Sequence, residues 1–95
     1  MSTQIIAKDT PSWLVTIIKK IKFDQLNFVI KTAIKTYLNQ LPRKEESYDV
    51  NMIETSVSSE FLENFNQINY KKIPADKQKE LQKFLTDYVK QNKLI

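Results

Sequence analysis

Apolar residues recur at helical spacing in four separate segments of this 95-residue chain. In the segment spanning residues 25–41 they keep to one face over several turns, and shorter stripes of the same period cover residues 11–22 and 75–92. A stripe of this kind has to be buried against another element. The spacing therefore predicts amphipathic helices that pack through their apolar faces.

The remaining segment, residues 50–68, admits two interpretations. Ile53 and Phe61 belong to a series with helical spacing, whereas the alternation of apolar and polar residues at Tyr48–Met52 is typical of a short strand. The serines at positions 56, 58 and 59 are poor helix formers. We therefore predict either one long helix or a helix that begins after a break near Ser58, with a short extended segment near Tyr48–Met52 as the alternative for the first residues.

Short connections join these segments, so sequential helices should be antiparallel neighbours. We predict an all-α fold, a compact bundle of about four short antiparallel helices. The length is sufficient for one domain, which would comprise residues 1–95 as a single helical domain. Residues 1–9 are expected to form a flexible or loosely docked N-terminus.

The chain contains no cysteine, no histidine and no glycine. Disulfides, thiolate chemistry and the imidazole-dependent sites of most hydrolases and metalloenzymes are therefore impossible. Phosphate-cradling loops and dinucleotide fingerprints need glycine for close backbone approach. We expect a protein that is not an enzyme and has no catalytic residues, no metal site and no cofactor. The lack of cysteine favours the cytoplasm, and no apolar run reaches the length of a membrane span.

Charge is divided into three blocks along the chain. Residues 1–44 carry eight basic and two acidic side chains, residues 45–70 carry six acidic and no basic ones, and residues 71–95 carry seven basic and three acidic ones. The acidic block either faces lysines of the neighbouring helices, or it gives the protein a bipolar surface. A bipolar surface would favour head-to-tail self-association or electrostatic steering of a charged partner.

Five apolar residues fall outside the main stripes of the first two predicted helices. They are Trp13, Val15, Phe28, Val29 and Leu38. Together they give these helices more apolar surface than one core face needs, and aromatic residues are enriched at protein interfaces. We predict from them a partner or homodimer interface on the two helices. The alternative is that both helices are buried on two sides.

Lysines cluster on the same two helices. Lys19, Lys20 and Lys22 lie at the end of the first, and Lys31 and Lys35 share a face of the second. Such clusters can contact phosphates without reading bases, so sequence-nonspecific nucleic-acid binding is an alternative function. The single arginine argues against base-specific recognition, which relies on the bidentate guanidinium. A membrane partner is not expected, because the first helix needs its apolar face for the core.

The leading functional prediction is a small regulatory protein that acts by protein–protein interaction, as an adaptor, an accessory subunit or an inhibitor. The apolar flank on the first two helices would be buried against the partner. The lysines would steer an acidic partner surface toward it.

Overall fold

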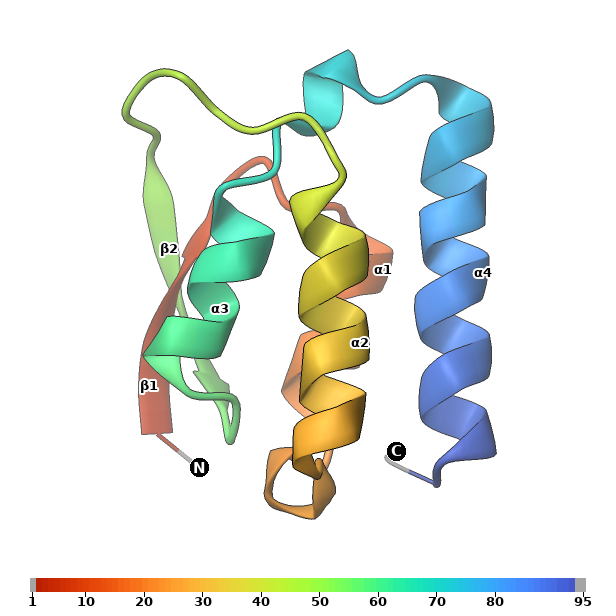
Figure 1. Cartoon of the computed structure of the whole chain (residues 1–95). Coiled ribbons are helices and arrows are strands. Elements are labelled where there is room, and N and C mark those ends of the chain that lie inside the picture. The colour runs from red at the N-terminus through yellow and green to blue at the C-terminus, as the bar shows by residue number, and fades with distance from the viewer. Residues whose placement is uncertain (1, 94–95) are drawn as a thin grey trace.

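The structure, a computed structural model, describes residues 2–93 (Figure 1). The helices in this part of the chain are α1 (Ser12–Lys20), α2 (Phe28–Asn39), α3 (Ser59–Asn66) and α4 (Ala75–Gln91), with 3₁₀ turns at Phe23–Gln25 and Tyr70–Lys72. The strands are β1 (Ser2–Ala7) and β2 (Val50–Thr55), which form an antiparallel sheet. The prediction of an all-α helical bundle is therefore wrong, because the fold is α/β and combines four helices with a two-stranded sheet.

The two strands pair over a long separation in the sequence, and no local hydrophobic period can reveal such a contact. Helical spacing continues through residues 50–68 because Ile53 on β2 and Phe61 on α3 are buried in the same core from different elements. A single long helix over this segment is thus wrong. The extended alternative describes its beginning better, although the strand occupies Val50–Thr55 rather than Tyr48–Met52.

The N-terminal residues belong to the folded domain, in contrast to the loosely docked terminus expected for residues 1–9. Ile6 and Ala7 at the end of β1 are buried. The side chain of Asn66, which is buried on α3, accepts a hydrogen bond from the Ala7 amide at 2.9 Å and donates one to the Ile5 carbonyl at 3.2 Å. Asn66 thereby takes the place of a neighbouring strand and satisfies main-chain groups that α3 covers. Met1 lies outside the described residues.

Polar side chains determine where two of the helices begin. Asn27 Oδ1 accepts from the amide of Ile30 at 2.9 Å, and Ser58 Oγ accepts from the amide of Phe61 at 3.3 Å. Each cap satisfies an N–H group that has no carbonyl partner in the first helical turn. As a result α2 begins at Phe28 rather than at residue 25, and α3 begins at the predicted break.

The core lies between the sheet and the helices. α1 packs on β2 and α4, while α3 packs on β1 and α2. In Figure 1, α2 and α4 run side by side in opposite directions, and the rings of Tyr37 and Phe84 stack between them with centroids 4.2 Å apart. This packing leaves the β1–β2 sheet at one side of the molecule, where part of its surface is uncovered (Figure 1).

Candidate functional site

The structure divides the predicted apolar flank. Leu38 is buried in the core, where no partner can reach it, so its assignment to a binding surface is corrected. Trp13 and Val15 are half-buried and pack against the core. Leu38 is enclosed because α2 is covered on two sides, by α3 and, through the stacked rings of Tyr37 and Phe84, by α4.

Phe28 and Val29 are the two flank residues that remain open. Their side chains are 82% and 71% exposed in the first turn of α2. They form a small apolar surface at the N-terminal end of the helix. This surface is narrower than the two-helix interface predicted from the sequence.

A second exposed apolar surface lies on the two-stranded sheet and was not predicted. Ile5 is 51% exposed and Met52 is 73% exposed, and the register places them directly opposite each other on β1 and β2. Val50, two residues before Met52, is exposed on the same face. The alternation of apolar and polar residues around Val50 indicated a strand with one exposed face. The surface was missed because the partner strand, β1, lies in residues 1–9, which were expected to be loosely docked.

The backbone of β2 presents an open edge beside these side chains. The amide of Lys8 donates to the carbonyl of Asp49 at 3.0 Å, which identifies this opposed pair as hydrogen-bonded. In an antiparallel ladder hydrogen-bonded pairs alternate with non-bonded ones. The N–H and C=O groups of Val50, Met52 and Glu54 therefore point away from β1.

Within residues 2–93 no hydrogen bond from another element covers those groups on β2. The outer edge of β1, in contrast, is occupied by Asn66 at Ile5 and Ala7. The two-stranded sheet thus has one edge, that of β1, covered by the side chain of Asn66, and one edge, that of β2, open. We call the open edge together with Ile5, Val50 and Met52 the β2 surface.

The predicted lysines also separate into two groups. Lys19, Lys20 and Lys22 line a hollow of about 460 Å³ together with Phe23, Asp24 and Ser56, and we call this region, where basic side chains outnumber acidic ones, the basic corner. On α2, the ammonium of Lys31 lies 4.5 Å from the ring centroid of Phe23, and that of Lys35 lies 5.9 Å from that of Phe61. The α2 lysines therefore cover aromatic rings of the fold as well as facing solvent.

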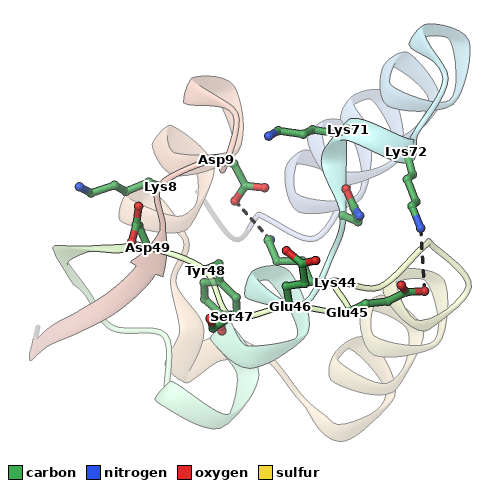
Figure 2. A pocket seen from close by; sticks show the side chains of 11 residues that line it. Lys8, Asp9, Lys44, Glu45, Glu46, Ser47, Tyr48, Asp49, Lys71 and Lys72 are labelled. Atoms are coloured by element: carbon green, nitrogen blue, oxygen red, sulfur yellow. Dashed lines mark ion pairs between the residues drawn. The ribbon is translucent and has the colours of Figure 1, made fainter.

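Lys44 anchors the loop between α2 and β2 (Figure 2). Its side chain is only 10% exposed, and its ammonium donates to the carbonyls of Asn66 at 2.7 Å and Ile68 at 2.6 Å while pairing with Asp9 at 3.2 Å. An ammonium has three N–H donors, and these contacts engage all of them. Lys44 therefore has a structural role and is not free to bind a ligand.

The hollow around Lys44 has a volume of about 580 Å³ and is lined by both charge signs (Figure 2). The ammonium of Lys44 also lies 5.3 Å from the ring centroid of Tyr70, whose pKa is raised by burial and whose hydroxyl donates to the Phe65 carbonyl at 3.0 Å. Lysines and carboxylates of the wall balance each other, which gives the hollow no strong preference for an anion or a cation. In the described part of the chain no three acidic side chains gather as a metal site.

The acidic block is mostly unpaired in the structure. Of its six carboxylates, Glu45 makes an ion pair, with Lys72 at 3.9 Å, and the others make none within residues 2–93. Most of the block is therefore not held to lysines by close ion pairs, although Glu45, Glu46 and Asp49 line the mixed-charge hollow around Lys44. Asp49 directly precedes β2.

Two surfaces of this chain thus combine exposure with chemistry suited to binding, the β2 surface and the basic corner. None of the helices described is both long and apolar enough for a membrane crossing. In comparisons with known proteins, no family model, no curated protein and no solved structure matches this chain.

Proposed function

We propose that this protein is a non-catalytic binding protein whose β2 surface pairs with an extended segment of another protein. The observation that carries the proposal is an unpaired strand edge flanked by exposed apolar side chains. Strand addition uses such an edge, because main-chain hydrogen bonds supply affinity and side chains of alternate residues supply specificity. An adaptor, an accessory subunit or an inhibitor would all act in this way.

The composition of β2 supports the proposal. Natural edge strands are usually protected by charged side chains, lysine above all, by proline, by a bulge or by a covering element. Val50–Thr55 contains neither lysine nor proline, and it pairs with β1 residue by residue without a bulge. Its one charged residue, Glu54, lies near the end of the strand, so the open edge at Val50 and Met52 is suited to pairing with a further strand. The cysteine-free composition is the ground for placing this role in the cytoplasm.

Sequence-nonspecific nucleic-acid binding is the second candidate, and the basic corner favours it. Lys19, Lys20 and Lys22 line one hollow, together with Asp24, and three neighbouring ammonium groups are compatible with contacts to phosphates. The arginine of the chain, Arg43, is engaged with Asn39 at 3.3 Å. Base-specific recognition therefore has no support in the basic corner.

The proposal is tested by partner capture with two matched variants, Met52→Lys and Phe28→Lys. Both replace an exposed apolar residue with lysine, but only Met52 lies on the β2 surface. We expect the wild-type chain and Phe28→Lys to retain the same protein, and Met52→Lys to lose it at least about tenfold, because an ammonium would be placed in an apolar contact. Quantitative mass spectrometry of the retained material gives the ratio.

Two outcomes would count against the proposal. Equal capture by Met52→Lys and the wild type, with loss in Phe28→Lys, would move the interface to the first turn of α2. Retained material that nuclease removes and that moderate salt releases would instead favour the second candidate.

A further inference from the structure

The outward-facing residues of β2 are complementary to themselves. Val50, Met52 and Glu54 all direct their main-chain N–H and C=O groups to the open edge. Two copies of β2 can therefore pair antiparallel in a register in which these outward-facing residues of one copy lie opposite those of the other. A register centred on Met52 places the two Met52 residues opposite each other and Val50 opposite Glu54. It uses all three outward residues of each copy, and no like charges face each other. Centring the pair on Glu54 would oppose two carboxylates.

The same register aligns the exposed apolar side chains. Ile5 already lies opposite Met52 within one copy. Pairing about Met52 extends this contact into a row across four strands, with a Met52 pair in the middle and Ile5 at each end. Directly opposed side chains in antiparallel strands lie within contact distance, so the most exposed apolar residue of the sheet becomes covered on both sides.

The charges near the two ends of β2 are opposite in sign, with Asp49 at one end and the lysines of the basic corner at the other. Asp49 precedes the strand and makes no ion pair within residues 2–93. Ser56 follows the strand, accepts from the Phe23 amide at 3.4 Å and lines the basic corner with Lys19, Lys20 and Lys22. Antiparallel pairing brings Asp49 of one copy opposite Thr55 of the other, next to that corner. Opposite charges therefore meet at both ends of the paired strands.

From this complementarity we infer that the β2 surface binds a second copy of the chain, through antiparallel pairing of two β2 strands about a two-fold axis at Met52 that gives a four-stranded sheet. The inference rests on the proposed function, since it identifies the partner of the same surface. Such an interface is isologous, with one patch contacting itself. It differs from the dimer predicted on the first two helices, because neither helix forms the contact.

The test is disulfide formation by single-cysteine variants of the purified chain. The natural sequence has no cysteine, so each variant carries one thiol at a chosen place. Opposed residues of a hydrogen-bonded antiparallel pair have Cα atoms about 5.5 Å apart, within the range of a disulfide. Met52→Cys is therefore expected to yield mostly covalent dimer under mild oxidation, measured on non-reducing gels.

Two controls define the register, and a third measures random collision. Glu54→Cys alone is expected to form little dimer, because Glu54 faces Val50 of the other copy. A mixture of Glu54→Cys and Val50→Cys should form the mixed dimer. Phe28→Cys, whose side chain is equally accessible but lies on α2, measures random collision. Dimer yields from Met52→Cys no higher than those from Phe28→Cys would overturn the inference.

Sedimentation equilibrium of the unmodified chain supplies the second measurement. We expect reversible, concentration-dependent dimerisation that Met52→Lys abolishes and Phe28→Lys leaves unchanged. A monomer at all concentrations would overturn the self-pairing. If that monomer still captures another protein through Met52, the proposed function stands and only the identity of the partner changes, so the two failures are distinguishable.

Discussion

Replacement of Lys44 by methionine should lower the free energy of unfolding by about 3 kcal/mol, because it removes a nearly buried charge from all of its partners. The carbonyls of Asn66 and Ile68 would lose their donors, and Asp9 would lose its counter-ion. Methionine keeps the length and apolar stem of the side chain, so lost packing contributes little. Urea denaturation followed by circular dichroism measures the change.

Lys72→Met is the matched control for this prediction. Lys72 pairs with Glu45 at 3.9 Å, and both side chains are largely exposed. Exposed ion pairs contribute about 0–1 kcal/mol, so this variant should unfold close to the wild type. A Lys44→Met protein as stable as Lys72→Met would show that the Lys44 contacts do not hold the loop before β2.

Proline substitutions at two adjacent exposed residues of β2 should have opposite consequences. The amide of Asn51 points to β1, so Asn51→Pro removes a ladder hydrogen bond and leaves an opposing carbonyl unpaired, at a cost of about 2 kcal/mol or more. The amide of Met52 points to the open edge, so Met52→Pro should cost only about 1 kcal/mol. Thermal unfolding of the two variants separates these outcomes.

The same pair of variants also bears on binding. Met52→Pro leaves the two-stranded sheet folded but removes the central donor of the open edge, so partner capture and self-association should both be lost. Similar destabilisation by the two prolines would mean that the amides of β2 do not alternate as the Lys8–Asp49 hydrogen bond indicates.

Much of the helical framework follows from the sequence, because each amphipathic stripe is a local property. The stripe of residues 75–92 becomes α4, and the stripe of residues 11–22 becomes α1, which begins at Ser12. The sheet does not follow, because the apolar residues of β1 stand next to one another instead of alternating with polar ones, and its partner strand lies beyond two helices. The pairing depends on tertiary contacts such as those of Asn66 with Ile5 and Ala7.

The sequence predicted that apolar side chains are exposed, but it did not predict where most of them lie. Phe28 and Val29, which were assigned to an exposed apolar flank, are exposed. Leu38 was misassigned because α2 is buried on two sides, which a single-face stripe does not anticipate. Ile5 and Met52 are separate in the sequence, and only the strand register brings them together.

Amide hydrogen exchange along β2 is the most direct test of an open binding edge. In the dilute chain the amides of Val50, Met52 and Glu54 should exchange freely, while those of Asn51, Ile53 and Thr55 should be protected by β1. At high concentration, where the edge is paired with a second copy, the first three should slow by about tenfold or more. Free exchange of the Met52 and Glu54 amides at every concentration, or their protection already in the dilute monomer, would contradict an open edge that pairs with another strand.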